Sequence, residues 1–220
     1  MVRRPPAPAP QATTTHAVLG MLALRPWTPY ELTHQVRRSL RYCWPVSERA
    51  LYAEPERLVA AGLATVEEEV AGRRTRRTYS ITDAGRDALR TWLGTAPAEP
   101  RFQFEAMLRL LFADIGTRED LLASIASFRA AMVEMMRDGV EQVAPYLDGE
   151  GPFPERAHIV ALFGALFGAL AETVIAWADA AAAEVDGWDT TAGLGLTAES
   201  RRHLEELVQA AAALGEPSTA

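Results

Sequence analysis

The chain has 220 residues, of which 49% are hydrophobic, so it can bury the core of one large domain or of two smaller ones. A formal net charge of −7 argues against indiscriminate binding to nucleic acids, and a single cysteine excludes an internal disulfide bond and a cysteine-rich metal site. Residues 16–92 nevertheless contain 12 arginines and 9 acidic residues, a net charge of +3, whereas residues 93–220 contain 8 arginines and 20 acidic residues, a net charge of −12. We therefore expect any contact with a polyanion in the first half of the chain.

The start of the chain is rich in proline and alanine. It lacks the apolar stretch and the small-residue cleavage site of a signal peptide, so residues 1–13 are predicted to form a disordered arm. The longest uninterrupted apolar run, Ile159 to Ala171, has 13 residues, fewer than the roughly 20 that a membrane-spanning helix needs. These features predict a cytoplasmic protein without a membrane partner.

Helix-capping signals predict three helices before the first strand. The first is predicted to start at the threonines of residues 13–15 and to run through Leu24. The second starts at TPYE, residues 28–31, where a threonine N-cap, a proline at the first helical position and a glutamate at the third form a capping box. Ser47 can cap the third helix, and Gly62 provides its C-terminal stop.

A charged run, VEEEVAGRRTRRTYSIT, follows the third helix, and its β-prone residues alternate with charges. Two strands joined by a tight turn at Ala71-Gly72 would place Glu69 opposite Arg74 and Glu67 opposite Arg76. Opposite charges across a strand pair contribute about 0.2–1 kcal/mol each, so the run can serve simply to hold a hairpin together. Beside a helix-turn-helix, the same arginines can exchange their glutamate partners for phosphates.

The rest of the chain is predicted to be helical. A helix at residues 83–93 follows the hairpin, and apolar stripes with helical spacing cover residues 104–111 and 121–147. We expect that one chain cannot bury these stripes completely, which predicts a homodimer. The sequence thus predicts a mainly α fold, in which a winged helix-turn-helix domain at residues 14–94 precedes an α-helical dimerisation domain at residues 101–215.

Four stretches within residues 16–93 resemble the PadR family of transcriptional regulators, in the order and spacing of that family. They are HAVLGMLAL, TPYEL, WPVSERALYAEPERLVAAGL and RRTYSITDAGRDAL. The chain departs from the family in two places, since Pro29 stands where glycine is frequent and Ala53, not proline, follows Tyr52. The resemblance implies a dimer whose winged-helix domains bind operator DNA and whose C-terminal helices dimerise, with a small effector between them.

The expected function is sequence-specific regulation of transcription, by a repressor that a small hydrophobic or aromatic effector relieves. The helix capped by Ser47 would enter a major groove, and the hairpin would flank the duplex. The residues predicted to contact double-stranded operator DNA are Thr28, Tyr30, Ser47, Arg49, Tyr52, Arg57, Arg73, Arg74 and Arg76. The residues predicted to bind the effector are Phe163, Phe167 and Trp177, although aromatic residues on an apolar helix also fit a hydrophobic core.

Other functions are open at this point. A winged helix that binds another protein in place of DNA would make the chain an adaptor. The pairs Glu31–His34 and Glu155–His158 have the ligand spacing of di-iron helical bundles, but both pairs fall at helix starts, where glutamate is explained by capping and by the helix dipole. The sequence shows neither a nucleophile–base set nor a phosphate-binding loop, so we expect no enzymatic activity, no metal and no other cofactor.

Overall fold

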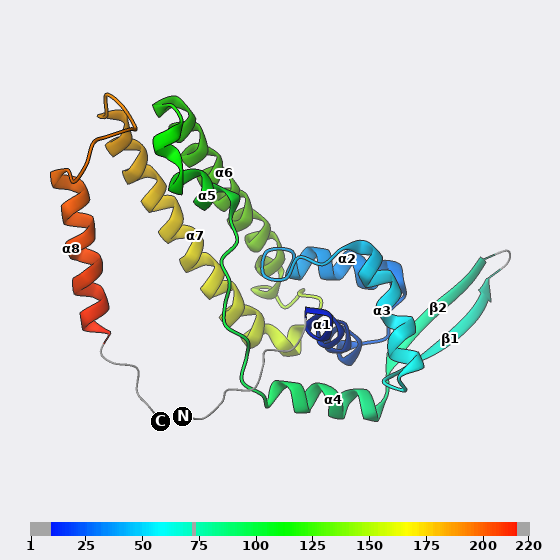
Figure 1. Ribbon diagram of the computed structural model, residues 1–220. Coiled ribbons are helices and arrows are strands. Elements are labelled where there is room, and N and C mark those ends of the chain that lie inside the picture. Colours follow the sequence, from blue (N-terminus) through cyan, green and yellow to red (C-terminus); the bar gives the residue numbers. More distant parts are fainter. Residues whose placement is uncertain (1–9, 72–73, 215–220) are drawn as a thin grey trace. The chain divides into compact units, whose positions relative to one another are not determined.

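The chain divides into two compact units, one up to Arg101 and the other from Phe102 onward (Figure 1). The computed structural model describes the backbone of residues 10–71 and 74–214 and the side chains of residues 13–70 and 75–214. Within these residues the first unit consists of α1 (Pro10–Leu24), α2 (Pro29–Leu40), α3 (Glu48–Ala60), β1 (Ala64–Ala71), β2 (Arg74–Ile81) and α4 (Asp83–Leu93). The second consists of α5 (Glu105–Leu111), η1 (Ala113–Ile115), α6 (Arg118–Val143), η2 (Ala144–Tyr146), η3 (Pro154–Arg156), α7 (Ala157–Asp186) and α8 (Ala198–Ala213). The predicted winged helix with a helical C-terminal region is confirmed.

The first helix starts earlier than the sequence predicts. α1 begins at Pro10, before the threonines predicted to cap it. These threonines contact other parts of the unit instead, because the Thr15 hydroxyl donates to Glu54 Oε1 at 2.5 Å and the Trp44 indole N–H donates to the Thr14 hydroxyl at 3.4 Å. The predicted helix start is therefore wrong, and the earlier part of the predicted arm lies outside the described residues.

The other predicted helix ends in the first unit are confirmed. In α2, the Glu31 N–H donates to Thr28 Oγ1 at 3.3 Å and the Thr28 N–H donates to Glu31 Oε2 at 3.0 Å, which completes the capping box. At the start of α3, the Ala50 N–H donates to Ser47 Oγ at 3.3 Å. Gly62 ends α3 with a φ of 72°, a left-handed conformation that favours glycine.

The core of the first unit lies between α1, α2 and α3. Its largest fully buried side chains include Leu19, Leu22, Leu32, Leu51 and Leu58. Trp27 and Tyr79, with exposed fractions of 3% and 2%, close this core at the base of the hairpin. The Trp27 N–H donates to the Tyr79 carbonyl at 3.0 Å, and the Tyr79 N–H donates to the Trp27 carbonyl at 2.8 Å. Main-chain hydrogen bonds therefore attach β2 to the segment between α1 and α2.

The two strands pair antiparallel, in a register two residues away from the predicted one. Glu68 faces Arg77 and Glu69 faces Arg76, so the predicted pairs of Glu69 with Arg74 and of Glu67 with Arg76 are wrong. The register depends on how both strands pack against the helices, which the weak turn signal does not report. Because side chains alternate along a strand, a shift of two residues leaves each side chain on its predicted face.

The core of the second unit lies between α6 and α7. Buried residues of α7 recur every seven positions, at Ala171, Ala178 and Val185. One buried cluster contains Met132, Met135 and Ala171, and the other contains Leu121, Ile125, Ala178 and Val185. The start of α6 thus packs against the end of α7, which means that the two helices run antiparallel. The predicted stripe of α6 supplies part of this core.

α7 is long, apolar and largely exposed. Pro154–Asp186 contains an 18-residue window with a mean hydropathy of 2.1, of which 6% is buried, so by length and composition the segment could cross a membrane. The prediction that no such segment exists is wrong, because Glu172 interrupts the apolar run but not the helix. The helix also packs against α6 and carries Asp179, which pairs with Arg129 of α6 at 2.6 Å. These contacts are typical of a helix packed within a helical domain.

Gly85, in the first turn of α4, has no room for a side chain. A Cβ atom there would lie 2.1 Å from the Leu63 carbonyl oxygen and 2.8 Å from Ile81 Cγ1. We expect Gly85→Ala to lower the free energy of unfolding of the first unit by about 1–3 kcal/mol, the usual cost of overpacking, as measured by urea denaturation. Gly20→Ala in α1 is the control, because its Cβ would meet no atom within 4 Å, and it should not destabilise the protein. Equal stability of both variants would contradict the close packing at Gly85.

Candidate nucleic-acid interface

α3 exposes the polar face that the sequence predicts. Arg49 and Arg57 are exposed, and Tyr52 has an exposed fraction of 45%, whereas Leu51 and Leu58 are each 1% exposed. No other described side chain forms an ion pair or hydrogen bond with Arg49. The outer face of α3 therefore presents a cation and an aromatic ring to solvent from a regular helix.

Three further residues predicted to contact DNA lie at helix starts. The Thr28 hydroxyl donates to Glu31 Oε2 at 2.8 Å, and the Ser47 hydroxyl accepts the N–H bond that caps α3, so both hydroxyls serve the helix caps. Tyr30 is 71% exposed and stacks against His34, with ring centroids 6.4 Å apart. Tyr30 is therefore the member of this group that reaches furthest into solvent.

Polar contacts hold α3 in place from its inner side. Glu54 is 6% exposed and accepts the Thr15 hydroxyl of α1, and Arg57 Nη1 lies 3.7 Å from Glu54 Oε2. Arg37 of α2 forms an ion pair with Glu48 in the first turn of α3. These contacts fix α3 against both neighbouring helices, so that its outer face has a defined position within the first unit.

Two arginines of the hairpin reach carboxylates on the helices. Arg76 Nη2 lies 3.6 Å from Glu31 Oε1 of α2. Arg77 Nε lies 2.8 Å from Glu68 Oε1 of β1, and Arg77 Nη1 lies 3.1 Å from Glu56 Oε1 of α3. The hairpin is therefore joined by ion pairs to both helices of the helix-turn-helix.

Sequence reasoning missed Arg77 and the two helix carboxylates. Strand alternation predicts the face on which Arg77 lies, but no local pattern links it to Glu56, 21 positions earlier. Among the other residues predicted for the hairpin, Arg73 and the side chain of Arg74 lie outside the described parts of the chain. Their contacts with DNA stay predictions.

The electrostatic environment favours the charged forms of these pairs. Hydrogen bonds from the Thr28 N–H and hydroxyl lower the pKa of Glu31 below its ordinary value of 4.5, and the positive charges of Arg25 and Arg76 add to this effect. The Glu68 carboxylate raises the pKa of Arg77. Both shifts favour the charged forms of Glu31 and Arg77.

The predicted effector residues lie on α7. Phe163 and Trp177 have exposed fractions of 43% and 42%, and Phe167 is half-buried. The rings of Phe163 and Phe167 lie 4.7 Å apart, whereas Trp177 meets Phe128 of α6 edge-on at 6.3 Å. Phe167 also packs against the methionine-containing cluster of the α6–α7 core. The three residues thus belong to two aromatic groups, Phe163 with Phe167 on α7 and Trp177 with Phe128 of α6.

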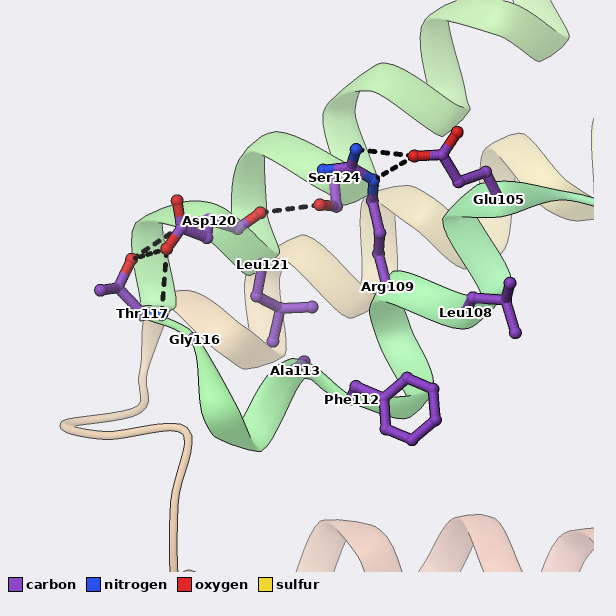
Figure 2. A pocket seen from close by; sticks show the side chains of 10 residues that line it. All are labelled: Glu105, Leu108, Arg109, Phe112, Ala113, Gly116, Thr117, Asp120, Leu121 and Ser124. Carbon is purple, nitrogen blue, oxygen red and sulfur yellow. Dashed lines mark hydrogen bonds and ion pairs between the residues drawn. The ribbon is translucent and has the colours of Figure 1, made fainter.

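A separate open pocket of about 430 Å³ lies between α5, η1 and the start of α6 (Figure 2). Leu108 and Phe112 line one part of it, and Thr117 and Asp120, which cap α6, line another. Arg109 also reaches the pocket but is held by an ion pair within α5. The predicted effector residues do not line this pocket, so the location of an effector site stays a prediction.

The lowered pKa of Glu31 makes part of the stability of the first unit depend on pH. The folded carboxyl holds its proton less tightly than the unfolded one, so its contribution is complete above about pH 4.5 and is lost as the pH falls through the lowered folded pKa. We expect Glu31→Gln to be less stable than the wild type at pH 7, and this difference to shrink below pH 4.5 in urea titrations. Glu67→Gln is the control, because Glu67 is exposed and lies opposite Thr78. A difference for Glu31→Gln that is constant down to acidic pH would contradict the role of its charge.

Comparison with known proteins finds a family match for most of the first unit. Residues 18–91 match the family described as "Transcriptional regulator PadR-like family". The negative transcriptional regulator PadR of Bacillus subtilis is 25% identical over 107 residues, which are 48% of this chain and 59% of that relative, so the match spans less than two thirds of its length.

Solved structures extend the similarity across most of the chain. Bacillus subtilis PadR in complex with operator DNA has a TM-score of 0.66 and 20% identity, and the match covers 79% of this chain and 99% of that one. Bacillus subtilis PadR in complex with p-coumaric acid has a TM-score of 0.61 and 20% identity, with 83% and 100% covered. At these identities the structures show a shared fold. The chain therefore contains a domain of the PadR-like family at residues 18–91 and shares its fold with solved PadR structures.

Proposed function

We propose that the protein is a homodimeric, sequence-specific DNA-binding regulator of transcription that acts in the cytoplasm as a repressor. The observation that carries this proposal is the outer face of α3, where Arg49 and Tyr52 are exposed next to an arginine-bearing hairpin. The match to a PadR structure solved with operator DNA supports double-stranded DNA as the partner. The protein acts by binding and requires no catalytic reaction.

The two elements have different roles in this proposal. α3 enters a major groove, where arginine can read guanine and a tyrosine can pack against the backbone or a base. The hairpin lies along the phosphates, which position the protein but do not specify bases. Among the described residues, Arg76 has one ion pair, an exposed contact at 3.6 Å with Glu31, and such a pair contributes little to stability. Exchanging that carboxylate for a phosphate therefore costs little.

Exposed apolar side chains of the second unit support the homodimer. They include Met107, Leu108, Leu111, Phe112 and Ile115 near α5, and Ile159, Leu162, Phe163 and Leu166 on α7, with exposed fractions from 43% to 82%. Exposed apolar side chains in this number are typical of an interface. A second copy of the chain is the proposed partner for it, because two tethered winged helices bind two half-sites far more tightly than one.

A small aromatic or hydrophobic effector is the proposed signal. Its support is the match to a PadR structure solved with p-coumaric acid. Phe163, Phe167 and Trp177 are the candidate contacts, since an exposed aromatic ring can stack with an aromatic ligand. Binding at α7 would alter the dimer and through it the spacing of the two winged helices.

A gel-retardation assay of the purified protein on the DNA upstream of its own gene tests DNA binding. We expect a salt-sensitive shift that Arg49→Ala and Tyr52→Ala each weaken without unfolding the protein, because both side chains lie on the outer face of α3. Leu58→Ala removes a fully buried side chain and should cost about 2–5 kcal/mol of stability. Absence of a shift at low salt would leave a protein-binding adaptor as the function, and equal melting temperatures for Tyr52→Ala and Leu58→Ala would contradict the assigned faces.

Light scattering tests the dimer. At micromolar concentration we expect about twice the 24.0 kDa mass of one chain. Leu166→Glu should lower this mass toward that of one chain, because the new charge lies on the exposed apolar stripe of α7. Val70→Glu places the same charge on an exposed apolar residue of the hairpin and should leave the mass unchanged. A wild-type mass of 24 kDa would exclude the dimer.

A further inference from the structure

Arg77 and Arg76 are neighbours in β2 but lie on opposite faces of the hairpin. Arg77 shares its face with Ala64 and Tyr79, which have exposed fractions of 3% and 2% and pack against the helical core. This is the inner face, and Arg77 lies on it just beyond the buried base. Arg76 lies on the outer face, where the strands meet solvent.

The contacts of the two arginines differ in number and geometry. Arg76 makes one ion pair, at 3.6 Å, with Glu31. Arg77 makes two at shorter distances, from Nε to Glu68 at 2.8 Å and from Nη1 to Glu56 at 3.1 Å. Two donors of one planar guanidinium thus connect β1, β2 and α3. The negative charge of two carboxylates surrounds Arg77, which leaves it poorly suited to attract a phosphate.

The hairpin depends on such a connection because, apart from the longer Arg76–Glu31 pair, the attachment to the helical part that the described residues show is the main-chain pairing at its base. Trp27 pairs with Tyr79, and the ladder then continues outward for five more pairs, from Thr78 to Arg74 on β2. An isolated two-stranded hairpin is marginally stable in water, so its orientation depends on the few contacts that it makes with the helices. The pair of Arg77 with Glu56 joins the hairpin to the DNA-facing helix itself.

We propose that Arg77 is a positioning residue, which clamps the hairpin to α3 through Glu56 and Glu68 and so sets the distance between the groove-reading helix and the phosphate-binding hairpin. This inference rests on the proposed DNA-binding function for its consequence, but the clamp itself is a property of the DNA-free protein. Arg76 and Arg77 then have separate tasks: Arg76 meets phosphates, and Arg77 holds the hairpin that carries it.

Hydrogen exchange of the DNA-free protein tests the clamp directly. Glu56→Gln and Arg77→Gln should each speed amide exchange in the peptide that covers β1 and β2 by about two- to fivefold, the change expected for loss of exposed ion pairs. The double variant should exchange no faster than Arg77→Gln alone, because both changes remove one shared contact. Glu67→Gln is the matched control, since it removes the same charge from the other face of the hairpin and should leave the exchange unchanged. Unchanged exchange in Glu56→Gln and Arg77→Gln would overturn the proposal.

DNA binding separates a clamp from a phosphate contact. Arg76→Ala should flatten the slope of log affinity against log salt by about 1.8, at roughly 0.9 per phosphate in each of two protomers. Arg77→Gln should leave this slope unchanged. It should weaken binding by about four- to twenty-five-fold, because a two- to fivefold loss applies to each of the two hairpins of a dimer. Arg77→Lys should behave like Arg77→Gln, because a single ammonium cannot reproduce two donors in a fixed fork.

The two kinds of failure can be distinguished. If Arg77→Gln flattens the salt slope as Arg76→Ala does, and Arg77→Lys restores it, Arg77 is a phosphate contact and the clamp is overturned. If the wild-type protein binds no DNA, the proposed function fails, while hydrogen exchange still decides whether Arg77 clamps the hairpin. Glu56→Gln also removes a negative charge near the DNA, so its effect on affinity is read against that of Glu67→Gln.

Discussion

The backbone pairing of Trp27 with Tyr79 is the constraint on which the candidate nucleic-acid interface depends. Both side chains are almost completely buried, and two hydrogen bonds of 3.0 and 2.8 Å join their main chains. Because β2 is held at this point, alternation along the strand turns Arg77 inward toward α3 and Arg76 outward. Fixing one residue pair thus determines which hairpin charge meets Glu56 and which meets Glu31.

The parts of the fold that local chemistry controls were predictable from the sequence. A capping box or an N-cap needs only residues within one helical turn, so Thr28, Ser47 and Thr82 begin their helices as their sequence indicates. The hairpin register depends on a contact more than 50 positions away along the chain, between Trp27 and Tyr79. A turn signal as weak as Ala-Gly carries no information about that contact, so the predicted register failed although the predicted faces survived.

The candidate interface, too, was predictable only where local periodicity controls it. Helical periodicity was enough to predict that Arg49 and Tyr52 face outward while Leu51 and Leu58 face inward. It could not predict that Arg76 and Arg77 pair with glutamates of α2 and α3, because such pairs depend on how separate elements pack. The apolar segment in α7 was judged too short to span a membrane for a different reason, since a count of uninterrupted apolar residues stops at Glu172, although one glutamate does not end the helix.

Charge placement reconciles an acidic protein with the proposed nucleic-acid partner. The net charge of −7 comes from the second half of the chain, and in residues 16–92 the 9 acidic residues offset most of the charge of the 12 arginines. In the described structure, the glutamates pair with Arg76, Arg77, Arg57 and Arg37 but leave Arg49 on α3 without a partner. Balanced charges weaken attraction to an arbitrary duplex, because each paired arginine must first give up a carboxylate. Under the proposed function, only DNA whose groove fits α3 while its phosphates reach the hairpin would replace those partners, so the paired glutamates would favour specific binding over general attraction.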